Sequence, residues 1–199
     1  MTGWQDLKEG TARPLDSVPV CLRGDLAAAY AELDRRLAEA VQAPDDSMAA
    51  GTEALQIAEQ MTALRERMEE HTYRFTFQAL PRRAYRDLVD EHPPRESHPE
   101  DAAYGVNMAV FPVELIAASC VAITPVTEPE PDIRPDAAPV MTAADVEDMT
   151  DQLSDGQVHA MFSCAFRLNR SGVDLPKSAT ASELVATHAP RSKQPEPGA

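Results

Sequence analysis

Residues 72–79 constrain the fold most, because apolar and polar side chains alternate along them without a break. Tyr73, Phe75, Phe77 and Ala79 share one face, and every side chain on the other face is polar. This period of two is typical of a strand with one buried face. The sequence therefore predicts a strand over 72–79.

A short helix is predicted directly after this strand. Pro81 suits the first turn of a helix, where its missing N–H costs nothing. An apolar face follows at helical spacing and ends at the pair Pro93–Pro94; it consists of Ala84, Tyr85, Leu88 and Val89.

Two amphipathic helices are predicted ahead of the strand, over residues 25–42 and 54–68, and Asp25 is the candidate N-cap of the first. Because the polar residues 43–51 separate them, we expect an antiparallel helical hairpin that projects and packs mainly on itself. Its two apolar seams are Leu26, Tyr30, Leu33, Leu37 and Val41, and Ala54, Ile57, Met61, Leu64 and Met68.

A second strand is predicted just before the hairpin, where Val18, Val20 and Leu22 alternate with other residues. Pro19 restricts it to the edge of a sheet. A hairpin returns its end close to its start, so we expect residues 18–22 to pair antiparallel with residues 72–79. Two strands are marginal alone and need a helical cover.

The remainder of the chain predicts short helices. A loop over 95–109 precedes a helix from Phe111 through Val121, and residues 124–140 are rich in proline and acids, as in a disordered or extended linker. Two further helices begin at Thr142 and Ser154. Ser154 and Gln157 have the spacing of a capping box.

The expected fold is mostly α with a small β element: a projecting antiparallel helical hairpin between two short strands, followed by a small helical bundle. We divide the chain into a flexible N-terminal arm (1–16), strand–hairpin–strand (17–80), a helical cover of the core (81–123), a proline-rich acidic linker (124–140), a two-helix segment (141–170) and a flexible tail (171–199).

Charge and composition exclude several classes of function. The formal net charge of −15 argues against non-specific nucleic-acid binding. No run of 18 apolar residues is present, so we expect no membrane span, and the first residues lack the pattern of a signal peptide. Cys21, Cys120 and Cys164 are odd in number and widely spaced, which favours reduced thiols, the latter two buried as small hydrophobes.

Catalytic and cofactor motifs are missing from the sequence. It has no phosphate-binding glycine loop and no zinc-protease motif. His92 and His98 lie near acidic residues, but their spacing matches no zinc pattern. We therefore expect no enzyme activity, no metal and no cofactor.

Five arginines fall within 22 residues of this acidic chain. In one interpretation they pair with the chain's own acids, such as Asp87, Asp90 and Glu91, and stay solvated. In the other they form a docking patch for an acidic partner, since the planar guanidinium recognises carboxylates with defined geometry. Residues 128–155 hold nine acids and one base, so self-association is a further possibility. The candidate partner-binding residues are Arg74, Arg82, Arg83, Arg86 and Arg95.

The run FTFQALPRRAYRDLVDEHPPR (75–95) resembles the tail assembly chaperones of long-tailed, siphovirus-type actinobacterial phages and prophages. Three further segments occur in the same order: CLRGDL (21–26), FPVELIAASC (111–120) and LSDGQ (153–157). The resemblance covers roughly residues 18–170. Tryptophan is frequent in the family where this chain has Tyr85, Val158 and Phe162.

The resemblance implies a non-enzymatic protein that binds the tape-measure protein and keeps it soluble before the tail tube polymerises. It also implies a longer frameshifted form of the chain as a partner, action in the cytoplasm of the bacterial host, and absence from the mature virion. Two other hypotheses remain open: a structural virion component, such as a head–tail connector or minor tail protein, and an acidic adaptor or DNA mimic.

Overall fold

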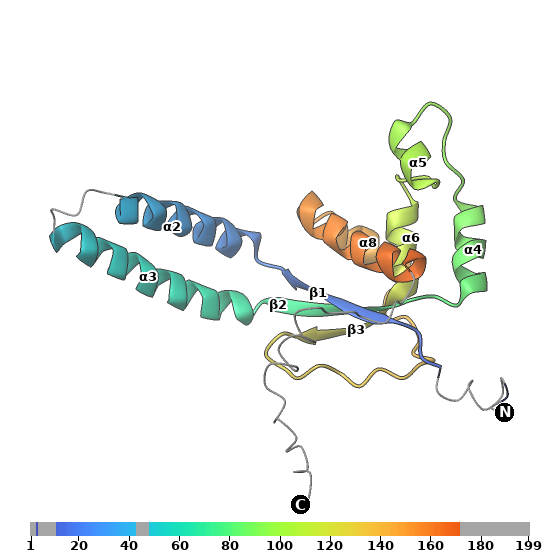
Figure 1. The fold of residues 1–199 in the computed structure, drawn as a ribbon, viewed down its shortest axis with the longest axis horizontal. Helices are drawn as coiled ribbons and strands as arrows, with labels where there is room; N and C mark the ends of the chain where they lie inside the picture. Colours follow the sequence, from blue (N-terminus) through green and yellow to red (C-terminus); the bar gives the residue numbers. More distant parts are fainter. Residues whose placement is uncertain (1–2, 4–10, 43–47, 172–199) are drawn as a thin grey trace, which may run out of the picture.

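The computed structural model describes residue 3 and residues 11–42 and 48–171 (Figure 1). The predicted tail, apart from Ser171, and most of the predicted N-terminal arm lie outside these residues. The elements, in order, are β1 (Leu15–Cys21), α2 (Gly24–Gln42), α3 (Met48–Glu69), β2 (Thr72–Gln78), α4 (Arg82–Glu91), α5 (Pro99–Tyr104), α6 (Phe111–Ser119), β3 (Cys120–Pro125), α7 (Ala143–Thr150) and α8 (Asp155–Arg170).

The coarse fold class is confirmed: most elements are helices, and the strands form a small antiparallel sheet in the order β1-β2-β3. The predicted pairing of the first two strands is also confirmed, with Val18 opposite Phe75 and Cys21 opposite Thr72. β1 begins at Leu15, however, inside the predicted arm. The backbone N–H of Ala79 donates to the carbonyl of Pro14, so the paired region extends beyond the residues that alternate.

Helices α2 and α3 leave the ends of β1 and β2 in the same direction and lie side by side (Figure 1). Ile57, Met61 and Leu64 of α3 are buried, as is Leu26 of α2. Asp25 is not the N-cap, because α2 begins at Gly24 and places Asp25 in its first turn. Its carboxylate accepts hydrogen bonds from the guanidinium of Arg23, which lowers the pKa of Asp25 to about 2.

The main core lies on one face of the sheet, between it and the helices α4 to α8. The apolar face of β2 contributes Phe75 and Phe77, both buried. The rings of Phe111 and Phe162 meet edge to face at 6.4 Å and join α6 to α8. No residue of α2 or α3 belongs to this cluster, among the residues that the structure describes.

Strand β3 corrects the sequence analysis, which predicted helix through Val121. Helix α6 ends at Ser119, and Cys120 begins a strand that pairs antiparallel with β2. The β-branched residues Val121, Ile123 and Thr124 favour a strand over a helix. The predicted loop over 95–109 likewise contains a short helix, α5.

Residues 126–140, which we call the strap, run along the other face of the sheet (Figure 1). They are extended, but they are tied to the sheet and do not act as a free linker. The N–H of Val126 donates to Thr72 and the N–H of Val140 donates to Cys120, both to backbone carbonyls. The strap covers the polar face of β2, so Thr76 and Gln78 are 7% and 1% exposed.

Candidate partner-binding site

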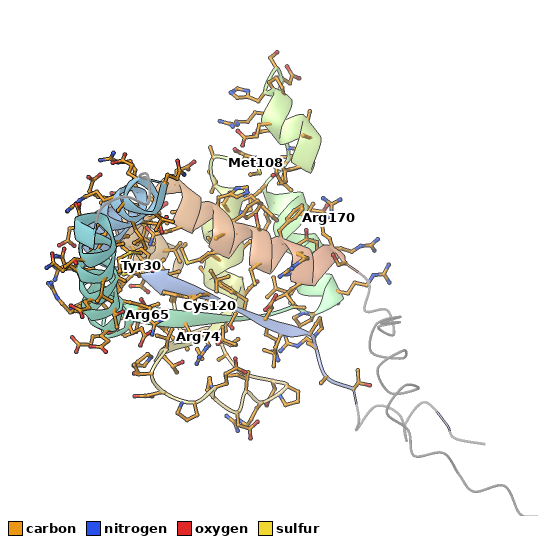
Figure 2. All side chains as sticks on the ribbon, turned by 60° about the vertical axis from the view of Figure 1, so that its left-hand side comes forward. Tyr30, Arg65, Arg74, Met108, Cys120 and Arg170 are labelled. Atoms are coloured by element: carbon orange, nitrogen blue, oxygen red, sulfur yellow. The ribbon has the colours of Figure 1, made fainter. Side chains whose placement is uncertain are left out.

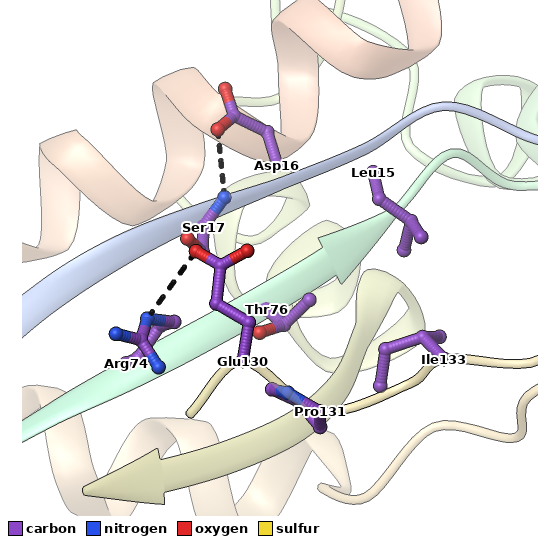
Figure 3. Close-up of a pocket in the computed structure, with 8 residues that line it drawn as sticks. All are labelled: Leu15, Asp16, Ser17, Arg74, Thr76, Glu130, Pro131 and Ile133. Atoms are coloured by element: carbon purple, nitrogen blue, oxygen red, sulfur yellow. Dashed lines mark hydrogen bonds and ion pairs between the residues drawn. The ribbon is translucent and has the colours of Figure 1, made fainter. Parts of the chain in front are cut away.

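Arg74 lies on the strap side of β2 and is engaged within the chain. Its Nε is 3.8 Å from Oε1 of Glu130, and its Nη1 donates to the carbonyl of Glu128 at 3.3 Å (Figure 3). The side chain is only 18% exposed. Arg74 is therefore not part of the candidate docking patch, because two groups of the strap, the carboxylate of Glu130 and the carbonyl of Glu128, already contact its guanidinium.

Arg95 is also engaged, and its partner is the buried carboxylate of Asp101, at 0% side-chain exposure. The guanidinium donates to both carboxylate oxygens, at 2.7 and 2.9 Å. The same carboxylate accepts from the backbone N–H groups of Arg95 and Met108. These bonds hold the pKa of Asp101 well below its usual range and tie the turn after α4 to α5. Arg95 is a structural residue.

The remaining candidates, Arg82, Arg83 and Arg86, lie exposed on α4. Arg83 is 4.0 Å from Asp87, a loose surface pair. Arg82 and Arg86 make no hydrogen bond or ion pair within the part of the chain that the structure describes. Both are exposed to solvent, as the first interpretation expects, and they lie beside Asp87 and Asp90 without forming an ion pair within the described residues.

A groove runs between α4 and the C-terminal end of α8. Its floor is apolar and is made by Leu80, Tyr85 and Leu168, while Arg82 and Arg86 line its α4 side. Arg13 lines it from the segment before β1, and no carboxylate is among its lining residues. An apolar floor with arginines at the rim suits a partner segment that presents apolar and acidic side chains together.

Arg170 adds positive charge at the end of α8. It shares a neighbouring hollow with Tyr85, Arg86 and Asp90, and its guanidinium lies 4.9 Å from the ring centroid of Phe166. Burial raises the pKa of the Tyr85 hydroxyl, and the charge of Arg170 opposes that shift. In Figure 2, Arg170 marks the end of α8 and Arg74 lies away from it on the sheet.

Sequence reasoning missed Arg13 and Arg170. Arg13 is in the predicted flexible arm, yet its guanidinium donates to the carbonyls of Ala79 and Pro135, at 2.8 and 2.7 Å. Arg170 ends the last predicted helix, far in sequence from α4. No local pattern links either residue to α4, because tertiary packing alone brings them together.

Among the described residues, no group of three or more His, Cys, Asp or Glu side chains is arranged to hold a metal ion. Cys120 and Cys164 are buried, which raises the pKa of their thiols to about 12 and about 11. Within residues 11–42 and 48–171, no helix has the length and apolar character needed to cross a membrane.

Comparisons with protein-family models, with curated proteins and with solved structures find no match to this chain.

Proposed function

We propose that this chain is a non-enzymatic tail assembly chaperone of a siphovirus-type phage or prophage, which binds the tape-measure protein and keeps it soluble in the host cytoplasm. The observation that carries the proposal, beside the ordered family segments, is the pair α2 and α3. Among the described residues, none from α2 or α3 belongs to the main core. We propose that the two helices form a projecting arm that contacts the client.

The arm has unburied apolar side chains toward its far end. Val41 of α2 is 70% exposed and Leu55 of α3 is 61% exposed. The buried apolar residues of the two helices lie closer to the sheet along the chain; they are Leu26, Ile57, Met61 and Leu64. An amphipathic client helix buries its apolar face by laying it against such residues. We therefore assign the first client contacts to this part of the arm.

The charge of the chain supports a role in keeping a client dispersed. Acids outnumber bases by 33 to 18, and a net charge far from zero opposes aggregation of a complex. A longer frameshifted form that shares this N-terminal part would carry the same arm. The proposed client helices are long, apolar on one face and prone to aggregate when free.

Co-expression with the tape-measure protein from the same phage or prophage tests the proposal. We expect the tape-measure protein in the soluble fraction with the wild-type chain, and several-fold less of it with Val41→Ser and Leu55→Ser combined. Val140→Ser, at a 52% exposed position on the strap, is the matched control and should behave as wild type. Equal solubility of the client without this chain would refute the proposal.

Mass spectrometry of purified particles separates the chaperone from a structural virion component. A chaperone leaves before the tail is complete, so we expect no peptides of this chain in mature particles. Peptides at the level of known tail proteins would replace our proposal with that of a connector or minor tail subunit.

A further inference from the structure

Helix α7 and the turn after it form an acidic surface. Glu147, Asp148, Asp151 and Asp155 are exposed, and none of them forms an ion pair with any residue that the structure describes. No lysine or arginine occurs between Arg134 and Arg167. We call these four side chains the α7 acidic face.

The groove between α4 and α8 has the complementary character. Arg82 and Arg86 form no ion pair among the described residues, and no carboxylate lines the groove, while Asp87 and Asp90 lie with them on the adjoining surface of α4. Arg170 adds a positive charge next to it. The chain as a whole is strongly acidic, so a groove whose own lining holds arginines and no carboxylate departs from its average surface.

The two surfaces lie at opposite ends of α8 and cannot meet within one molecule. Asp155 is in the first turn of α8, whereas Leu168 and Asn169 line the groove at its last turn. At 1.5 Å per residue, these ends are about 20 Å apart along the helix. Helix α7 packs on α6 and does not run back along α8 toward the groove.

We infer that the chain associates with itself head to tail, with the α7 acidic face of one copy seated against the arginine-lined groove of the next. A second copy is the favoured occupant because the chain itself carries the unpaired carboxylates that the groove lacks. Such a contact is heterologous: each copy offers one surface of each kind, so pairs extend into short chains or close into rings. The interface is charge-dominated and therefore weak and reversible.

Sedimentation velocity on the purified full chain tests this inference without any client. We expect the average mass of the wild type to rise with concentration between about 10 μM and 1 mM, as for weak association. Arg82→Glu with Arg86→Glu should weaken association at least about tenfold, and Asp148→Lys with Asp151→Lys should do the same. Both pairs are exposed. Arg82 lies in the first turn of α4, where a carboxylate is favourable, and Asp148 and Asp151 lie at the end of α7, where a cation is favourable.

The decisive experiment mixes the two charge-reversed variants. The first variant keeps its acidic face and the second keeps its groove, and the two reversed surfaces are complementary to each other. The mixture should therefore associate as the wild type does, although neither variant associates alone. Arg36→Glu with Arg65→Glu, on the α2–α3 arm, changes the net charge by the same amount as the groove variant and should associate as wild type. Circular dichroism and melting curves establish that each variant is folded.

Three results would overturn the inference: a wild type that stays monomeric over the whole range, reversed variants that associate as wild type, or folded variants that fail to complex when mixed. Self-association is measured without the client. A failed co-expression test therefore does not affect this inference, and a monomeric wild type does not affect the proposed chaperone function.

Discussion

Two threonines on β2 differ in how their hydroxyl groups are satisfied. Thr76 is 7% exposed beneath the strap, and its Oγ1 has no hydrogen-bond partner among the described residues. The Oγ1 of Thr72 donates to the carbonyl of Met68 at 2.7 Å and so links the strand to the end of α3. A buried hydroxyl without a partner costs stability, whereas a paired one does not.

Opposite effects are therefore expected from the same substitution at these sites. Thr76→Val keeps the β-branched shape and removes the unpaired hydroxyl, and should raise the free energy of unfolding by about 1 kcal/mol. Thr72→Val removes a formed hydrogen bond and should lower it by about 1 kcal/mol. Urea unfolding followed by circular dichroism measures both, and a loss of stability in Thr76→Val would contradict the description of the strap interface.

The buried carboxylate of Asp101 is the second residue with a testable role. Asp101→Asn leaves Arg95 without its charged partner and should lower the melting temperature by at least about 5 °C. The control is Asp87→Asn, which disturbs only a loose surface pair and should change the melting temperature by less than about 1 °C.

Asp101 also makes stability depend on pH. Its pKa in the folded chain lies below that of the unfolded chain, which is about 4. The carboxylate therefore stabilises the fold fully above about pH 4, and this contribution is lost as the pH falls further toward the folded pKa. Melting curves from pH 6 to pH 2.5 should fall less steeply for Asp101→Asn than for the wild type. Parallel curves would contradict this assignment.

At the scale of elements, the starts of α7 and α8 followed their local sequence, whereas the N-cap predicted at Asp25 was wrong. The capping box predicted at Ser154 is present, with Oε1 of Gln157 accepting from the N–H of Ser154 at 3.1 Å, and Thr142 and Asp145 form a second one at α7. The amide of Gln157 also donates to the carbonyl of Cys21 at 2.8 Å. One local motif thus also fixes α8 to the end of β1.

Ser154→Ala should lower the free energy of unfolding by about 1 kcal/mol, because the N3 amide loses its acceptor. Ser163→Ala, in the interior of the same helix, is the control and should not lower stability, since alanine is the better helix former. Equal losses in both variants would indicate that the cap contributes nothing.

The elements that the sequence misassigned depend on distant partners. Residues 120–125 follow a helix with no intervening loop, and their strand exists because the free edge of β2 accepts them. The strap is rich in proline and acid, yet the polar face of β2 holds it in place through Arg74 and backbone carbonyls. The β-branched residues of 121–124 are a local signal for the strand, but the contact that determines each feature lies about fifty residues away in sequence.

At the scale of the whole molecule, thiol reactivity reports whether the core is closed. Cys120 and Cys164 are buried with raised thiol pKa values, whereas Cys21 is partly exposed. At pH 8 we expect a thiol reagent such as DTNB to modify Cys21 at least tenfold faster than the other two. In urea all three should react at similar rates. Rapid modification of Cys120 in the native chain would contradict the packing of α6 against the sheet.

The candidate site shows how much of a surface can be predicted from a sequence. All five arginines were selected by proximity along the chain, but only the exposed ones of α4 share a surface. Arg74 and Arg95 point elsewhere, because strand and turn geometry send them to the strap and to Asp101. Arg13 lines the groove and Arg170 lines the neighbouring hollow, and the two come from opposite ends of the described chain.

The sequence by itself determined the strand at 72–79, its partner, the amphipathic helices and the caps of α7 and α8, because period and capping chemistry act over a few residues. Only the tertiary structure decided that a third strand joins the sheet and that the strap covers its polar face. It alone also left two arginines of α4 without partners beside the end of α8. Such pairings depend on which distant surfaces pack together, and that is set by burial over the whole chain.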